Sequence, residues 1–142
     1  MKYIVEETMF YSLNRLIVKI KKNMAKQIKP YDVTLEQWSL LTRLWKNDGI
    51  YQTELAIRTN KDLPTVTRTL VKLREKGLIE KKENPNDSRA YLIYLTEEGK
   101  KLENPLDSIA QEVENKILKD LSPSEIATFK EIINSISNKF DN

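Results

Sequence analysis

The chain of 142 residues has a net charge of +3, from 24 basic and 21 acidic residues, and contains neither cysteine nor histidine. This composition excludes thiol redox chemistry, thiolate or imidazole metal sites and histidine general bases, and no tight carboxylate cluster suggests a metal or catalytic site in their place. Hydrophobic residues make up 39% and charged residues 32%, which is typical of a helix-rich protein with a real core. Because the sequence shows no apolar run of membrane-spanning length and no signal-peptide pattern, we expect a cytoplasmic protein that spans no membrane and needs no cofactor.

Apolar residues recur at helical spacing through the first 29 residues: Phe10, Leu13, Ile17, Ile20, Met24 and Ile28. This periodicity predicts one amphipathic helix that ends before Pro30. Thr34 and Gln37 have the spacing of a capping box, which predicts the start of a second helix. A short third helix is predicted over 54–59, with Asn60 as its left-handed stop.

The next predicted helix, over 63–76, has two chemically different sides. Asp62 is its predicted N-cap and Gly77 its stop. The apolar residues predict the side that faces the core: Leu63, Val66, Leu70 and Leu73. Hydroxyl and basic residues gather on the other side or its flanks: Thr65, Thr67, Arg68, Thr69 and Lys72. These residue types suit contacts with DNA bases and phosphates, although an ordinary solvated helix face is the alternative.

Two strands, over 78–83 and 90–95, are predicted around a polar turn at 84–89. The order helix, strand, turn, strand is that of a winged helix, in which the helix enters the major groove and the hairpin reaches the backbone beside it. Residues 65–89 include seven basic and four acidic residues, and this positive net charge suits the binding of a polyanion.

The predicted turn and the start of the short helix add four candidate DNA contacts. Arg89 is predicted to contact the DNA backbone or minor groove, and Asp87 to pair with it or fix its orientation. For Asp87, stabilisation of the turn is the alternative. Gln52 and Thr53, at the start of the short helix, are predicted to donate hydrogen bonds to a DNA phosphate.

The first helix and the carboxyl-terminal helices carry apolar residues at spacings of three and four, and Pro105 should kink or split the helix that begins after Thr96. A small middle domain shields only part of these apolar stripes. We therefore predict that 1–32 and 100–142 form a helical dimerisation region around a DNA-binding lobe at 33–99. Packing of these helices on their own domain is the alternative.

The motifs of the middle segment resemble those of a known family. The most specific motif consists of Asp87-x-Arg89, then five residues, then Leu95-Thr96, then two residues and Gly99. Three shorter runs support it: Glu54-Leu55-Ala56, Thr65-Val66-Thr67-Arg68 and Lys76-Gly77-Leu78-Ile79. In this order and at these spacings, the runs resemble the MarR family of bacterial transcriptional regulators.

The resemblance implies a mainly α fold with a small two- or three-stranded wing, the winged helix-turn-helix. It also implies a homodimer that binds an inverted-repeat operator in double-stranded DNA, usually as a repressor. Many members of the family release DNA when a small aromatic ligand binds between the dimer helices and the DNA-binding lobe. Tyr11, Arg15 and Trp38 are the candidates to bind such a ligand here, with plain core packing as the alternative.

The chain departs from the family pattern at Tyr51, where the family usually has a Thr or Ser helix cap. The redox-sensing branch of the family uses cysteines, which are absent here, so oxidation is excluded as a trigger. A winged helix that assembles with another protein and has no DNA target remains the alternative function. An enzyme finds no support, because the sequence has no phosphate-cradling glycine loop and no nucleophile with a base.

Overall fold

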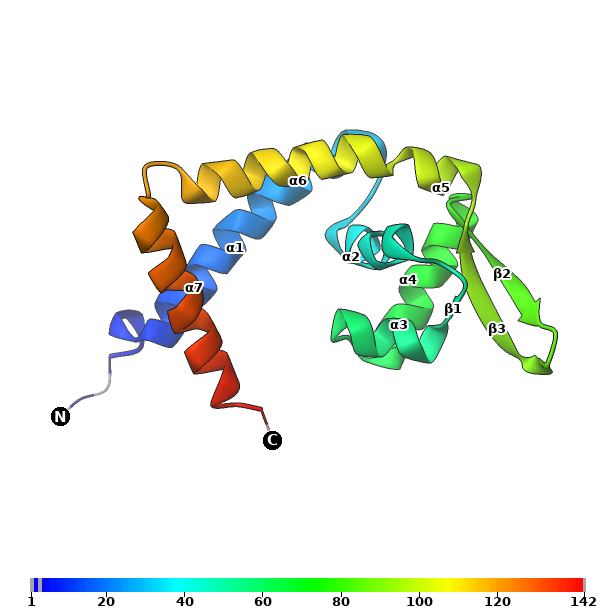
Figure 1. The fold of residues 1–142 in the computed structure, drawn as a ribbon, viewed down its shortest axis with the longest axis horizontal. Coiled ribbons are helices and arrows are strands. Elements are labelled where there is room, and N and C mark those ends of the chain that lie inside the picture. The colour runs from blue at the N-terminus through cyan, green and yellow to red at the C-terminus, as the bar shows by residue number, and fades with distance from the viewer. Residues whose placement is uncertain (1, 3, 142) are drawn as a thin grey trace. The chain divides into compact units, whose positions relative to one another are not determined.

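The computed structural model of the chain describes residues 2 and 4–141, except the side chains of residues 88 and 89. The chain divides into two compact units, Met1–Ala110 and Gln111–Asn142. Helices dominate both units, and a small antiparallel sheet lies in the first unit (Figure 1). The predicted fold class, mainly α with a small wing, is confirmed.

The helices of the first unit are α1 (Met9–Ile28), α2 (Leu35–Lys46), α3 (Gln52–Thr59), α4 (Leu63–Glu75), α5 (Glu97–Lys101) and the beginning of α6 (Glu103–Leu118). The second unit contains the end of α6 and α7 (Pro123–Asn138). The strands are β1 (Ile50–Tyr51), β2 (Ile79–Asn84) and β3 (Asp87–Leu95).

Local capping sets most helix boundaries. The first helix begins at Met9, because the Thr8 hydroxyl accepts a hydrogen bond from the Tyr11 N–H. The prediction of one helix from the first residues onward is therefore wrong before Thr8, where Val5–Glu7 forms a short 3-10 helix. The predicted capping box at the start of α2 is confirmed.

The end of α3 and the start of α4 follow the predicted caps, whereas α3 begins at Gln52, two residues before its predicted start. The Asp62 carboxylate accepts the Thr65 N–H at 2.8 Å and begins α4. Asn60 ends α3 in the left-handed region at a φ of 57°, and Gly77 follows α4 at a φ of +74°. The predicted break near Pro105 is confirmed, since α5 and α6 are separate helices.

The three strands are ordered β1-β3-β2, and both pairs are antiparallel. We call the β2–β3 hairpin the wing. Its turn is tighter than predicted, because β2 continues to Asn84 and β3 already begins at Asp87. The register shifts between Glu83, which pairs with Tyr91, and Asn84, which pairs with Asp87.

The core of the first unit lies between α2, α3, α4 and the sheet. Its fully buried side chains include Leu40, Leu41, Leu44, Leu55, Val66, Leu70, Leu73, Ile79 and Ile93. The predicted core side of α4 is confirmed at Val66, Leu70 and Leu73, which are buried. The prediction is wrong for Leu63, because this residue is 43% exposed. As the first residue of α4, Leu63 leans toward the amino end of the helix, away from the packed turns that follow.

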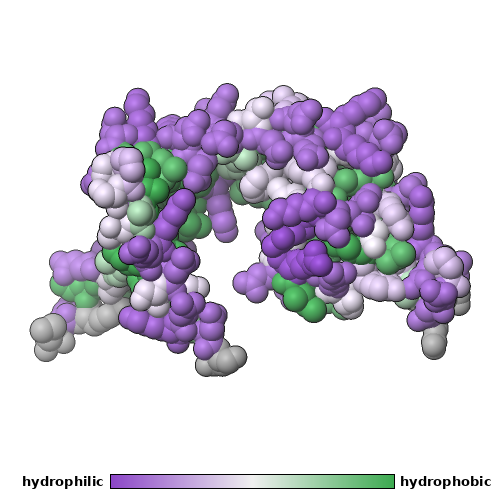
Figure 2. All heavy atoms as spheres, in the orientation of Figure 1, coloured by the Kyte–Doolittle hydropathy of each residue, from purple (hydrophilic) through white to green (hydrophobic). Residues whose placement is uncertain are grey.

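Helices α1 and α7 keep large apolar side chains exposed. On α1 these are Met9, Phe10, Leu13, Leu16, Ile17 and Val18; on α7 and just after it they are Phe129, Ile132, Ile133, Ile136 and Phe140. The residues of α7 are all described, and none of them is buried. Figure 2 shows hydrophobic residues at the surface of the part of the chain that contains α7. No described helix is both long enough and apolar enough to cross a membrane.

Candidate DNA-binding surface

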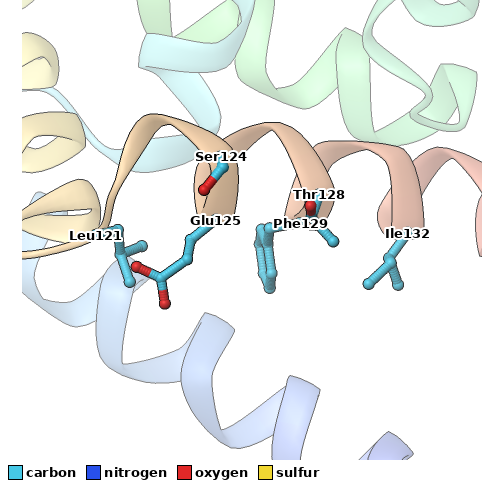
Figure 3. A pocket seen from close by; sticks show the side chains of 6 residues that line it. All are labelled: Leu121, Ser124, Glu125, Thr128, Phe129 and Ile132. Carbon is cyan, nitrogen blue, oxygen red and sulfur yellow. The ribbon is translucent and has the colours of Figure 1, made fainter.

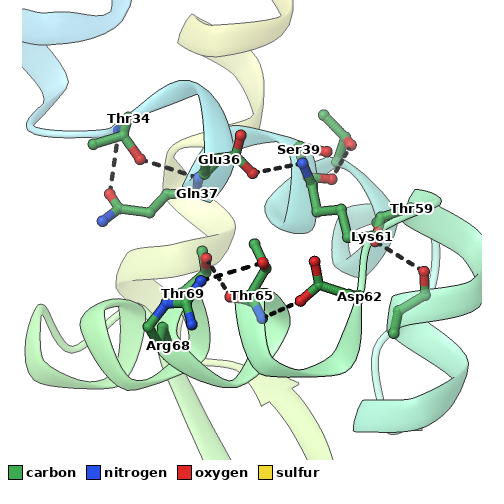
Figure 4. A network of polar contacts seen from close by, with 12 residues as sticks. Thr34, Glu36, Gln37, Ser39, Thr59, Lys61, Asp62, Thr65, Arg68 and Thr69 are labelled. Carbon is green, nitrogen blue, oxygen red and sulfur yellow. Dashed lines mark hydrogen bonds and ion pairs between the residues drawn. The ribbon is translucent and has the colours of Figure 1, made fainter.

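The exposed side of α4 carries hydroxyl and basic groups that point away from the core. We call the residues Thr65, Thr67, Arg68 and Lys72 the α4 surface. Arg68 and Lys72 are exposed, and one Arg68 Nη donates a hydrogen bond to the Thr65 hydroxyl at 3.3 Å (Figure 4). A guanidinium has five N–H donors, so this contact leaves most of the hydrogen-bonding capacity of Arg68 for a ligand.

Thr69 differs from the prediction. Its side chain is buried, with 8% exposure, and its hydroxyl donates to the Thr65 carbonyl at 2.9 Å. The packed side of α4 is therefore wider than the apolar pattern alone predicts, since it includes Thr69. Because the side chain of Thr69 is buried, the α4 surface omits it, and its predicted DNA contact stays a prediction.

The start of α3 lies against the α4 surface. Gln52, the first residue of α3, donates a hydrogen bond from its side-chain amide to the Thr67 hydroxyl. The hydroxyl of Thr67 itself donates to the Leu63 carbonyl at 2.9 Å. The structure thus brings together two predicted site residues that are 15 positions apart, and Thr53 is exposed beside them.

The amino-terminal ends of α3 and α4 differ in their capping. Tyr51 is the N-cap of α3, and among the described side chains none caps this end, as the departure at Tyr51 predicted. The first N–H groups of α3 are therefore open to a phosphate oxygen. At α4, the Asp62 carboxylate occupies this position. At α4, side chains rather than the amino end of the helix are therefore open to a ligand.

Local hydrogen bonds keep Asp62 ionised. The Thr65 N–H that donates to its carboxylate lowers the pKa of Asp62 below the usual value of 3.8, and the Thr65 hydroxyl and the charge of Arg68 act in the same direction. The N-cap is therefore negatively charged at neutral pH, which suits the positive end of the α4 dipole.

Two lysine contacts hold the ends of α4 against α2. Before α4, Lys61 Nζ lies 2.5 Å from a carboxylate oxygen of Glu36, which Figure 4 shows together with the Asp62 cap. After α4, Lys76 Nζ donates to the Gln37 side chain at 2.8 Å and to the Asp32 carbonyl at 2.5 Å. Sequence reasoning missed both contacts, because each joins residues at least 25 positions apart.

The wing carries the remaining predicted contacts. Asp87 is exposed at the start of β3, and Arg89 belongs to the same strand, but the side chain of Arg89 lies outside the described residues. Its DNA contact and its pairing with Asp87 stay predictions. At the end of β2, Asn84 donates from its side-chain amide to the Tyr51 hydroxyl, a contact that the sequence did not indicate.

The predicted ligand residues are brought together only in part. An open groove of about 340 Å³ on α1 is lined by Tyr11, Asn14, Arg15, Val18, Lys19 and Lys22. Trp38 is not among the described residues that line it. The indole N–H of Trp38 is buried, with no hydrogen-bond partner in the described part of the chain.

A second open groove, of about 380 Å³, runs along α7 in the other unit (Figure 3). Its lining side chains recur at spacings of three and four: Leu121, Ser124, Glu125, Thr128, Phe129 and Ile132. The helical periodicity of this segment was the signal that could have found it, since such spacing places these residues on one side of a helix.

Comparison with known proteins agrees with this architecture. The model of the MarR family matches residues 33–91, from before α2 into the wing. The HTH-type transcriptional regulator BilQ of Clostridioides difficile is 30% identical over 131 residues, which are 89% of this chain and 86% of that protein. The multiple antibiotic resistance protein MarR of Salmonella typhimurium is 30% identical over 129 residues, which are 87% of this chain and 90% of that protein.

Solved structures give the same assignment. A MarR transcriptional regulator from Methanosarcina mazei superposes with a TM-score of 0.81 at 29% identity, covering 94% of this chain and 98% of that one. MepR of S. aureus, solved in complex with DNA, superposes with a TM-score of 0.89 at 27% identity and the same coverage. The matched proteins form a family of regulators rather than of enzymes. The wing motifs, the three-stranded sheet and the similarity over nearly the whole length lead to one conclusion: the chain belongs to the MarR family of transcriptional regulators.

Proposed function

We propose that this regulator is a repressor that binds an inverted-repeat operator in double-stranded DNA as a homodimer. The proposal depends on one observation: a hydrogen bond from the Gln52 side chain to the Thr67 hydroxyl connects α3 to α4 at the candidate surface. The exposed Arg68 lies next to Thr67 in the sequence. MepR, which shares this fold and was solved with DNA, supports the proposal.

Each residue of the surface has a proposed contact. Arg68 reads base edges or neighbouring phosphates together with Thr65 and Thr67, and Lys72 neutralises a phosphate. Gln52 and Thr53 bind a phosphate at the uncapped start of α3. The wing residue Arg89 contacts the backbone or the minor groove, and Asp87 orients it.

The homodimer forms through the outer helices, 1–32 and 100–142, around the DNA-binding lobe 33–99. Phe129 and Ile132 of α7 are 49% and 51% exposed in the single chain, and Phe10 of α1 is 80% exposed. An apolar surface of this kind requires a partner, and the helical spacing of its residues suits another helix of the same type. A second copy of the chain supplies that partner.

Release from DNA is the proposed regulatory step. In the groove on α1, Tyr11 offers a ring and Arg15 a cation, which together suit a small aromatic acid. Because the proposed target is DNA, we place the activity in the cytoplasm.

The test is a binding titration with labelled duplexes selected from a random library. Fluorescence anisotropy should show a preferred duplex, and its affinity should fall by at least about a hundredfold as salt rises from about 50 to 200 mM, because bound phosphates release counterions. A selected palindrome would also report the dimer. No preference for any duplex at low salt would reject DNA binding and favour the alternative of protein–protein assembly.

A further inference from the structure

We infer that Tyr51 is a positioning residue for DNA binding: its hydroxyl holds the tip of the wing at a set place relative to α4. The inference deepens the proposed function and rests on it, since wing and α4 bind one duplex only if their separation matches the DNA.

The contact joins the two edge strands of the sheet. Tyr51 lies on β1 and Asn84 ends β2, while β3 runs between these strands. The Asn84 side-chain amide donates to the Tyr51 hydroxyl across this central strand. The hydrogen bond therefore spans the whole width of the sheet.

The backbone ladder alone restrains the wing tip weakly. The strand β1 has two residues and pairs with β3 only at Ile93 and Leu92. Toward the turn, β2 and β3 continue as a two-stranded ribbon, and isolated ribbons of this kind are marginally stable in water. The register shift after Glu83 disrupts the ladder just before the tip. The contact to Tyr51 begins at Asn84, immediately beyond this shift.

The orientation of the Asn84 amide is determined by the turn. Its oxygen accepts the Asn86 N–H at 2.9 Å, and only the amide oxygen can accept. The amide nitrogen must then lie on the side of Tyr51, where it donates to the hydroxyl. One side chain thus closes the wing turn and ties it to β1.

The same segment also connects to α4. Tyr51 is the N-cap of α3, and in the described structure its side chain makes no capping bond, so the hydroxyl serves the wing alone. The next residue, Gln52, donates to Thr67 on the α4 surface. Two consecutive residues therefore link the wing tip to α4, and loss of the Tyr51 hydroxyl frees the wing without altering α4.

The test compares two substitutions that each remove one hydroxyl. Tyr51→Phe deletes the acceptor of the Asn84 bond. Tyr91→Phe is the matched control, because Tyr91 also lies on the sheet and its ring, 5.8 Å from Lys81 Nζ, is retained. The probe is the duplex that the wild-type chain selects from a random library. We expect Tyr51→Phe to bind it about three- to tenfold more weakly, the range for one lost hydrogen bond, and Tyr91→Phe to bind it within about twofold of wild type.

Two further measurements separate positioning from general destabilisation. Hydroxyl-radical footprints of Tyr51→Phe should lose protection at the outer edges of each half-site and keep it at the centre, while the melting temperature stays that of the control. Asn84→Ser keeps an oxygen for the Asn86 N–H but lacks the amide donor. Its combination with Tyr51→Phe should weaken binding no more than the stronger single change, because both remove one interaction.

Equal affinity and equal footprints for wild type and Tyr51→Phe would overturn the inference and leave DNA binding intact. The inference would also be overturned if the loss of DNA affinity in the double variant equalled the product of the losses in the two single variants. A wild-type chain that binds no duplex would instead reject the proposed function, and the inference with it.

Discussion

Arg68 and Lys72 lie on the same exposed side of α4, yet their chemistry suits different parts of DNA. The guanidinium of Arg68 is a planar fork that can donate two parallel hydrogen bonds to one guanine edge, whereas the ammonium of Lys72 is a compact point charge suited to phosphate. The contact from Arg68 to the Thr65 hydroxyl restricts the orientation of the fork before DNA arrives.

Replacement of Arg68 should therefore reduce specificity as well as affinity. We expect Arg68→Ala to weaken binding to the selected duplex by about 1–3 kcal/mol and to relax preference at one base pair of each half-site. Anisotropy titrations against single-base variants of the duplex measure both effects. Arg74→Ala is the control, because it removes the same charge from the same helix outside the α4 surface. Arg74 instead lines a groove with Lys81. Equal losses for Arg68→Ala and Arg74→Ala would remove Arg68 from the base contacts.

Gly99 shows how one position can depend on close packing. A Cβ at Gly99 would lie 2.1 Å from the Leu78 carbonyl oxygen, and the Gly99 carbonyl accepts the Trp45 indole N–H at 2.9 Å. We expect Gly99→Ala to lower the free energy of unfolding by about 3 kcal/mol, because neither backbone segment can move without disturbing the core. Urea unfolding measures this.

The comparison is Gly77→Asn. Gly77 has a positive φ of +74°, but no described atom lies within 4 Å of its added Cβ. Asn tolerates this conformation, so Gly77→Asn should cost less than about 1 kcal/mol. Equal costs at both glycines would contradict the packing explanation.

At the scale of elements, α4 is held at both ends by contacts outside its own sequence. Lys61 pairs with Glu36 before the helix, and Lys76 donates to Gln37 after it. Both partners belong to α2. This arrangement anchors α4 to the core while its other side remains exposed.

The Asp62 cap makes the stability of α4 depend on pH. Because the folded state lowers the pKa of Asp62 below 3.8, the unfolded chain binds more protons near that pH, and stability falls as the pH drops through and below about 4. Asp62→Asn keeps an oxygen for the Thr65 N–H but does not titrate. Its unfolding free energy, measured by urea at several pH values, should decline less in this window than that of wild type. Parallel curves for the two proteins would contradict a titrating cap.

The helix α7 carries the clearest prediction for assembly. Ile133 is 47% exposed among other apolar residues of this helix. We expect Ile133→Glu to weaken dimerisation by at least about tenfold, because an interface would bury an unpaired carboxylate. Light scattering at micromolar concentration should show wild-type dimers and monomers of the variant.

Asn134→Glu adds the same charge to the next residue, which faces away from the apolar stripe by helical geometry. It should leave the dimer intact. A monomeric wild-type protein at micromolar concentration would reject the homodimer and favour packing of the outer helices on their own chain.

At the scale of the whole molecule, charge is distributed unevenly. Residues 65–89 carry seven basic and four acidic groups, whereas 101–142 carry five basic and eight acidic ones. This distribution favours approach of DNA to the segment that contains α4 and the wing, and disfavours its approach to the acidic carboxyl-terminal segment.

A dimer presents two copies of α4 and requires a defined operator. Their centres should fit successive major grooves, roughly 34–36 Å apart, which predicts half-sites about one helical turn from each other. Insertion of about five base pairs between the half-sites turns them to opposite faces of the duplex. Affinity for this duplex should fall toward that of random DNA in the same anisotropy assay, and unchanged affinity would contradict binding as a symmetric dimer.

Several starts and stops of the helices were predictable because capping depends on neighbouring residues. Thr34, Asp62 and Asn60 act within four positions of their partners, so their motifs are visible in the sequence. The α4 surface was predicted for the same reason, since helical periodicity separates its two sides. The burial of Thr69 and the exposure of Leu63 were not predicted, because exposure depends on which neighbouring elements cover a helix.

The sequence by itself determined the family, the order of helices and wing, and the side of α4 that remains exposed. Only the tertiary structure decided which distant side chains meet there. The bonds from Gln52 to Thr67 and from Asn84 to Tyr51 join residues 15 and 33 positions apart. Periodicity and capping describe one element at a time, whereas such hydrogen bonds depend on how separate elements pack around a shared core.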